Sequence, residues 1–108
     1  MSPRPKKRGL SLFVVVGIGR LTLHLPESHS LKSKRALIGK LVARVRARFN
    51  ISAAEVDALD LWQKAVVGLA LAAPDETAAR HNLEAAVHEA ENITGLKSID
   101  VELEFRHL

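Results

Sequence analysis

The apolar residues of this chain recur at two spacings, and the order of these spacings is the strongest constraint on its fold. Apolar residues two positions apart indicate a strand, whereas spacings of three and four indicate one face of a helix. Short apolar or alternating runs occupy four segments, which are residues 12–25, 51–57, 64–73 and 99–106. The helical spacing occupies residues 30–49 and 75–95. The predicted order is strand, helix, strand, strand, helix, strand.

This order predicts an α+β fold of the ferredoxin-like βαββαβ type, a four-stranded antiparallel sheet with two helices on one face. Signals at the helix ends agree with it. Pro26 ends the first strand, Ser28 or Ser30 can cap the first helix, Asp75 starts the second helix and Gly95 stops it. At 108 residues the chain is long enough for one such domain and too short for two. We expect one domain over residues 11–108 and a basic mobile arm over residues 1–10.

The composition excludes several classes of protein. The chain has no cysteine, so a disulfide framework, thiolate chemistry and a cysteine-ligated zinc site are all excluded. No apolar run approaches the roughly 20 residues that a membrane-spanning helix needs, and the first residues contain no convincing signal-peptide cleavage site. The sequence therefore predicts a cytoplasmic protein with no membrane partner.

Charge is divided unequally between the two halves of the chain. Residues 1–48 hold 12 Lys and Arg against Glu27 alone, a net charge of +11, whereas residues 49–108 hold 4 against 11 acids, a net charge of −7. This division favours a polyanionic partner for the basic half. It also fits charge pairing within the molecule or between two subunits, so both interpretations stay open.

The first helix carries much of the positive charge and contains no acidic residue. On a helical wheel its basic residues lie on both flanks of the apolar stripe, with Lys32, Arg35 and Arg46 on one flank and Lys40, Arg44 and Arg48 on the other. The basic surface would be about 28 Å long. With three to five phosphate contacts, log K would fall with log salt concentration at a slope of about −3 to −4. The alternative is a solvated helix surface.

The turn before this helix is a second candidate site. A phosphate or carboxylate could be held there by the free N–H groups of the helix N-terminus together with Ser30, His24, Lys32, Lys34 and Arg35. The alternative is that the serines only cap the helix and the basic side chains are solvated.

Catalysis is not indicated by any motif. The chain has no nucleophile elbow, no phosphate-binding glycine loop and no HExxH helix. Its histidines and acids have no spacing that demands a catalytic set or a metal site. The sequence therefore favours a non-enzymatic protein, and it names no catalytic residue, cofactor or metal ligand.

Two further features concern contacts with other molecules. Trp62 lies between the second and third strands, where it is either a cap on the core, which the usual burial of aromatic residues favours, or an exposed partner anchor. The acids beside it, Glu55, Asp57 and Asp60, are expected to be solvated. The open sheet face has no aromatic residues on its central strands, so it is unsuited to stacking RNA bases. The residues expected to point outward from this face are Arg20, Thr22, His24, Val66, Gly68 and Ala70. The small apolar members fit a subunit interface better.

Five short segments resemble those of one known family. They are Leu23–Pro26, Ser30–Arg35, Arg48–Asn50, Glu55–Val56 and Asp60–Ala65. They are similar to the YlxP-like family of small bacterial proteins, and the similarity extends over residues 13–105. The resemblance implies a ferredoxin-like α+β fold, no established biochemical activity, and genes often beside those for translation initiation and ribosome-maturation factors. The basic arm before Gly9 departs from the usual short start of this family.

The leading hypothesis is a non-enzymatic protein that binds structured RNA or a ribosomal precursor. The residues expected to make the contact are Lys32, Lys34, Arg35, Lys40, Arg44, Arg46 and Arg48, assisted by Lys6–Arg8. The alternatives are a small-molecule or anion site at the turn of residues 28–35, and a structural homodimer joined through the open sheet face.

Overall fold

The computed structural model describes residues 14–96 and 99–108. In chain order its elements are β1 (Val15–His24), α1 (Leu31–Arg48), β2 (Ser52–Asp57), β3 (Lys64–Ala73), α2 (Glu76–Thr94) and β4 (Asp100–His107). The predicted order of strands and helices is confirmed. The predicted arm and the predicted start of the first strand at residue 12 lie outside the described residues.

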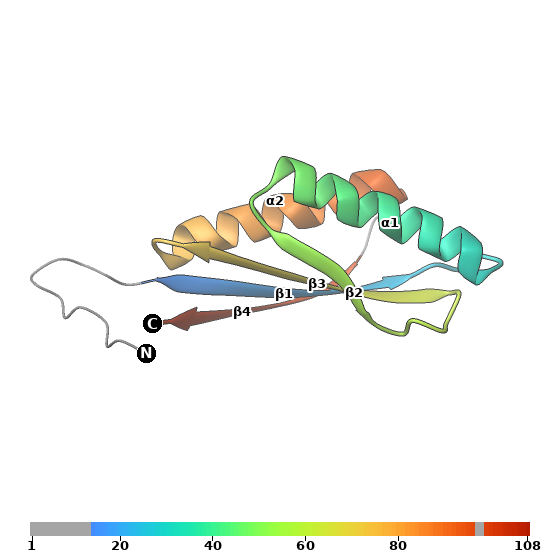
Figure 1. Cartoon of the computed structure of the whole chain (residues 1–108), viewed down its shortest axis with the longest axis horizontal. Helices are drawn as coiled ribbons and strands as arrows, with labels where there is room; N and C mark the ends of the chain where they lie inside the picture. The colour runs from blue at the N-terminus through green and yellow to red at the C-terminus, as the bar shows by residue number, and fades with distance from the viewer. Residues whose placement is uncertain (1–13, 97–98) are drawn as a thin grey trace, which may run out of the picture.

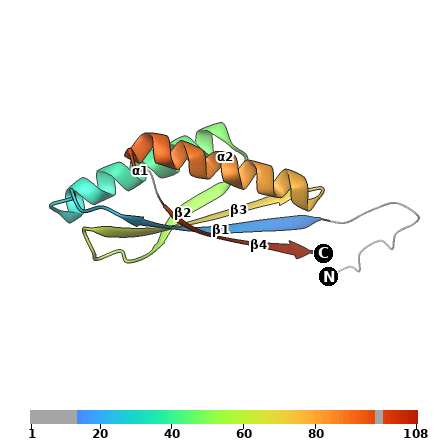
Figure 2. The same cartoon turned by 180° about the vertical axis from the view of Figure 1, so that it is seen from behind.

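The four strands form one antiparallel sheet in the order β2-β3-β1-β4. Both helices lie on the same side of it, as Figures 1 and 2 show from opposite directions. The fold is therefore the predicted ferredoxin-like α+β arrangement, with β1 and β3 as the central strands and one sheet face open.

The helix ends are fixed by the residues that the sequence indicated. Ser30 Oγ accepts a hydrogen bond from Ser33 N at 3.0 Å at the start of α1, and Asp75 Oδ1 accepts one from Ala78 N at 2.8 Å at the start of α2. Such caps satisfy N–H groups that have no partner within the helix. Gly95 ends α2 at a left-handed φ of 75°, which glycine adopts without steric cost.

The core lies between the sheet and the helices. Its fully buried side chains include Leu21 and Leu23 of β1, Leu41 of α1 and Leu83 of α2. A Cβ atom at Gly17 would lie 3.0 Å from Leu83 Cδ1. The absence of a side chain at Gly17 therefore lets α2 approach the middle of the sheet closely.

Candidate nucleic-acid interface on α1

The outward side of α1 is a strip of small residues. Ile38, Leu41 and Val45 face the sheet and are buried, so the opposite side of the helix faces solvent. This strip consists of Ala36, Gly39, Ala43 and Ala47, all exposed. Apart from the neighbouring backbone of α1 itself, no heavy atom of the described residues lies within 4 Å of the position that a Cβ atom would take at Gly39. Another molecule can therefore approach the helix backbone along this strip.

Four exposed basic side chains flank the strip, and they are Lys32, Arg35, Lys40 and Arg46. Within residues 14–96 and 99–108, no carboxylate oxygen lies within 4 Å of their charged nitrogen atoms. Four positive charges on one helix surface are therefore left to solvent or to a ligand. Charges of one sign gathered on one surface raise the local concentration of an oppositely charged partner.

Arg44 and Arg48 have a different role, because they contact α2. Arg44 Nη1 lies 3.2 Å from Glu89 Oε2, and Arg48 Nη1 lies 2.9 Å from Glu89 Oε1. The Glu89 side chain is 10% exposed, whereas the two arginine side chains are 48% and 58% exposed. The acid that compensates α1 therefore comes from the neighbouring helix, which explains how α1 can lack acids of its own.

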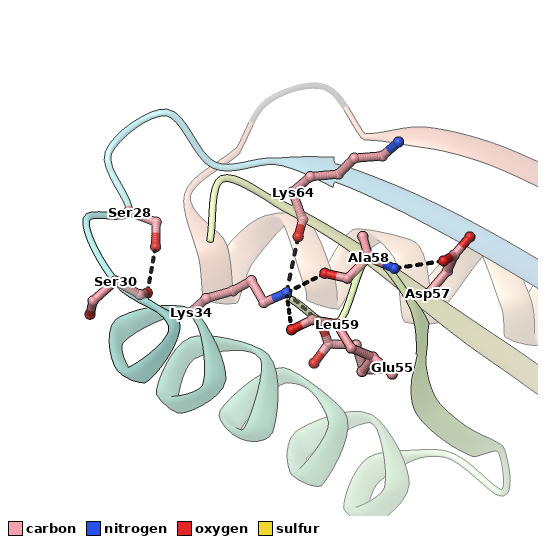
Figure 3. Close-up of polar contacts among 8 residues, drawn as sticks. All are labelled: Ser28, Ser30, Lys34, Glu55, Asp57, Ala58, Leu59 and Lys64. Atoms are coloured by element: carbon pink, nitrogen blue, oxygen red, sulfur yellow. Dashed lines mark hydrogen bonds and ion pairs between the residues drawn. The ribbon is translucent and has the colours of Figure 1, made fainter. Parts of the chain in front are cut away.

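Lys34 lies inside the protein, so its predicted place on the basic surface is wrong. Its side chain is fully buried, and its Nζ donates hydrogen bonds to three backbone carbonyl oxygens, two in the β2–β3 connection and one at the first residue of β3 (Figure 3). The distances are 2.7 Å to Ala58, 3.4 Å to Leu59 and 3.1 Å to Lys64. Lys34 therefore fastens this connection to α1 and is not available to an external anion.

The β2–β3 connection is held by several contacts besides Lys34. Glu55, expected to be solvated, has a side chain only 15% exposed, and its Oε2 lies 2.8 Å from Lys34 Nζ. Ala58 has a left-handed φ of 57°, and its N–H donates to Asp57 Oδ1 at 2.7 Å. A left-handed alanine persists only where surrounding contacts fix it. The connection therefore has one defined shape.

Trp62 lies in this connection, and the expectation that it caps the core is wrong. It is 47% exposed, beside Leu61 at 50% and Leu59 at 52%. Its role as a partner anchor stays a prediction.

Three residues of the predicted anion site, Ser30, His24 and Lys34, have polar partners within the chain. Ser30 Oγ already caps α1 and contacts the Ser33 hydroxyl at 3.1 Å. His24 lies on the open sheet face, where its Nε2 is 3.3 Å from Asp100 Oδ2. The turn borders a cleft of about 260 Å³ whose lining is largely apolar. The lining residues are Leu25, Pro26, Glu27, Ser28, Ser33, Leu37, Thr94 and Leu96.

Neither a metal-binding cluster nor a membrane-spanning helix is found in the part of the chain that the structure describes. No group of three His, Asp or Glu side chains among these residues is placed to bind one metal ion. No helix there is both long enough and apolar enough to cross a membrane.

Comparison with known proteins shows the family. Residues 16–103 match the family described as Protein of unknown function (DUF503). A curated relative, the Uncharacterized protein YlxP of Bacillus subtilis (strain 168), is 32% identical over 56 residues. That match covers 52% of this chain and 61% of the relative. The chain therefore spans less than two thirds of the relative's length.

Two solved structures are similar to this chain. The de novo designed protein Foldit4 has a TM-score of 0.50 at 18% identity, covering 87% of this chain and 96% of that chain. A mutant of SnoaB, a cofactor-independent oxygenase from Streptomyces nogalater, has a TM-score of 0.49 at 15% identity, covering 84% and 90%. At 18% identity the likeness to Foldit4 concerns the fold alone. The family match extends over most of the chain and confirms the resemblance read from its sequence, so the protein belongs to the DUF503 family of proteins of unknown function.

Proposed function

We propose that the protein is a non-enzymatic binding protein that contacts structured RNA of the ribosome or of a ribosomal precursor through the outward side of α1. The observation that carries the proposal is the set of four unpaired cations on that helix, Lys32, Arg35, Lys40 and Arg46. Away from α1, the described Lys and Arg side chains pair with carboxylates, with Lys64 as the exception. Within residues 14–96 and 99–108, unpaired positive charge is thus concentrated on one helix.

The shape of this surface supports contact with a phosphate backbone. The small residues of the strip leave room for phosphate groups, and the longer Lys and Arg side chains on both sides can reach them. α1 has 18 residues and is about 27 Å long. It carries no aromatic residue for stacking bases. The proposed binding therefore reads the shape and charge of the RNA rather than its sequence.

The choice of RNA rests on the family resemblance as well as on charge. The genes of YlxP-like proteins often lie beside those for translation initiation and ribosome-maturation factors. A ribosomal precursor is a structured polyanion, and such a partner matches the cationic side of α1.

A salt titration tests the surface. We would measure binding to a ribosomal RNA hairpin by fluorescence anisotropy at several KCl concentrations. Four phosphate contacts give an expected slope of log K against log salt concentration of about −3 to −4. The variant Arg35→Gln/Arg46→Gln is expected to reduce the slope by about 1.5 to 2. Arg44 and Arg48 are unsuitable for this test because they hold Glu89.

The matched control is Lys64→Gln/Arg80→Gln, which removes the same charge away from α1. It is expected to leave the slope close to that of the unchanged protein. Absence of binding at low ionic strength would reject RNA binding. An equal reduction of the salt slope in both double variants would show that the net charge of the protein, and not the charge on α1, governs the interaction.

A second experiment tests the identity of the RNA. The protein is purified at low salt without nuclease, the ratio of absorbance at 260 and 280 nm is recorded, and RNA eluted with salt is sequenced. Enriched ribosomal RNA, reduced for Arg35→Gln/Arg46→Gln, is the expected result. Protein free of nucleic acid, or RNA without ribosomal enrichment, contradicts the proposed partner.

A further inference from the structure

Exposed apolar side chains are concentrated on the open side of the sheet. Those on this face of the strands are Val14, Ile18 and Val56, with exposed fractions of 38% to 54%. The β2–β3 connection, which carries Leu59, Leu61 and Trp62, curves to the side away from the helices in both views (Figures 1 and 2). Neither α1 nor α2 has an exposed large hydrophobic residue. Such concentration of apolar surface is typical of an interaction site.

The small side chains on the same face leave room for another sheet to pack on it. Between the larger side chains lie small residues of β2 and β3, namely Ala54, Gly68, Ala70 and Ala72. Ala54, Gly68 and Ala70 border a shallow depression of about 310 Å³ that is also lined by Ile18 and Val56. Two sheets with such faces can pack at the usual separation of about 10 Å.

The charges of this face do not oppose packing against another copy of the chain. The acids on the open face of β4 have basic partners in the same chain, since Asp100 pairs with His24, Glu102 with Arg20 and Glu104 with Arg106. A two-fold axis lying between the sheets and across the strands sets β4 against the partner's β4, so these paired charges lie at the edge of the contact. It also places the apolar β2 and β3 against their counterparts. An axis along the strands would instead bury the β4 acids against apolar β2, which costs free energy.

We infer that two copies pack open face to open face about the axis across the strands. The result is a helix–sheet–sheet–helix sandwich in which Trp62 of each copy lies over the far end of the other sheet, near Val14. The outward side of α1 stays exposed in both copies, so this inference does not depend on RNA binding.

The size of the face is sufficient for a reversible dimer. Strands of six to ten residues in a four-stranded sheet project an area of about 28 Å by about 19 Å. This is about 530 Å² for each copy and about 1,100 Å² together before the connections are counted, near the lower end of specific interfaces. A concentration-dependent equilibrium between monomer and dimer is expected.

Sedimentation velocity over a concentration series tests the dimer with the whole chain. The expected result is a shift from a species of 11.8 kDa to one of twice that mass. Ile18→Lys is expected to weaken the dimer at least tenfold because it places a charge at the centre of an apolar contact. The matched control is Val101→Lys, since Val101 is 39% exposed against 38% for Ile18 but lies on the helix side of the sheet. A monomer at all concentrations would overturn the inference, and so would a dimer disrupted only by Val101→Lys.

Disulfide crosslinking tests the face by a separate route, because the chain has no cysteine of its own. Ala70→Cys, on the open face of β3, is expected to form a covalent dimer on mild oxidation. Ala43→Cys, on the outward side of α1, is the control and is expected to stay monomeric under the same conditions. Equal crosslinking of the two variants, or faster crosslinking of Ala43→Cys, contradicts the proposed face.

The same crosslink tests the axis. In a sheet of order β2-β3-β1-β4, the axis across the strands sets β3 against the partner's β3, whereas an axis along the strands sets β3 against the partner's β1. A dimer in which Ala70→Cys does not crosslink therefore rejects this orientation.

Discussion

Lys34 Nζ and Glu55 Oε2 lie 2.8 Å apart, with the lysine side chain fully buried and the glutamate side chain 15% exposed. Burial of two charges carries a desolvation cost that their attraction offsets only where further polar contacts are made. The backbone carbonyls of Ala58, Leu59 and Lys64 supply these contacts to Lys34. Among the described residues Glu55 Oε2 has no hydrogen bond of good geometry, so its attraction to Lys34 is ionic.

Replacing Lys34 by methionine is therefore expected to be strongly destabilising. Lys34→Met leaves the Glu55 carboxylate without its counter-charge and three carbonyl groups without their donor, and removing one partner of a buried pair costs about 3 to 5 kcal/mol of unfolding free energy. Urea denaturation followed by the fluorescence of Trp62 measures it.

The control for this prediction is Lys40→Met on the exposed side of α1, for which a change within about 0.5 kcal/mol is expected. Adding Glu55→Gln to Lys34→Met should recover part of the loss, because the unpaired charge is then removed. Equal stability of Lys34→Met and Lys40→Met would show that the buried pair contributes nothing.

The elements of the fold were predictable because each depends on local pattern. The third strand was expected over residues 64–73 and is observed there. Asp75 and Gly95 bound α2 as expected, since capping depends on residue type and backbone conformation within a few positions. The helical spacing and the alternation of the last strand likewise need no information from distant parts of the chain.

The misplaced side chains are those whose partners lie far along the sequence. Lys34 was assigned to the surface because lysine is rarely buried without a partner, and its partner Glu55 belongs to another element. The signal that could have revealed it is position, since residue 34 precedes Ile38 by four and so lies on the buried side of the helix. Arg44 and Arg48 are exposed on α1 as expected, but their shared partner Glu89 lies on α2 and is equally distant in the sequence.

Two glycines are expected to respond with opposite signs to the same substitution. Gly39 lies within α1 with open space around it, so Gly39→Ala should stabilise the protein by about 0.5 to 1 kcal/mol through helix propensity. Gly95 has φ 75°, so Gly95→Ala should destabilise it by about 1 kcal/mol or more. Chemical denaturation of both variants measures the two changes, and a shared sign would contradict the assigned conformations.

The pH dependence of stability is expected to include a contribution from Glu76. The hydrogen bond from His107, followed by that from Arg80, holds the pKa of Glu76 below its ordinary value of 4.5. Because the pKa is lower in the folded state, this contribution is present above the unfolded value and is lost as pH falls through the folded value. His107→Gln is expected to raise the pKa of Glu76, as measured by NMR titration of its side-chain carboxyl carbon.

The stability difference between the unchanged protein and His107→Gln should accordingly shrink as pH falls below about 4.5. His88→Gln, which changes a histidine elsewhere on α2, is the control and should leave the Glu76 titration unaltered. An identical titration of Glu76 in all three proteins would show that His107 does not stabilise the carboxylate.

Glu89 links the stability of the fold to the charge of the proposed RNA surface. Its carboxylate holds Arg44 and Arg48, so Glu89→Gln should cost about 1 to 2 kcal/mol of unfolding free energy through weakened charged hydrogen bonds. The same change releases two guanidinium groups on α1 and enlarges the set of free cations. RNA binding is then expected to strengthen, with a salt slope steeper by up to about 1.5 to 2.

Glu84→Gln separates this effect from net charge, because Glu84 is exposed on α2 and has no ion pair within residues 14–96 and 99–108. Both variants change the net charge by one, but only Glu89→Gln alters the cations of α1. If RNA meets the protein at α1, Glu89→Gln should weaken the fold and tighten binding, while Glu84→Gln should do neither. Equal salt slopes in the two variants would mean that RNA does not contact Arg44 and Arg48, and the interface would then have to lie away from the α2 side of the helix.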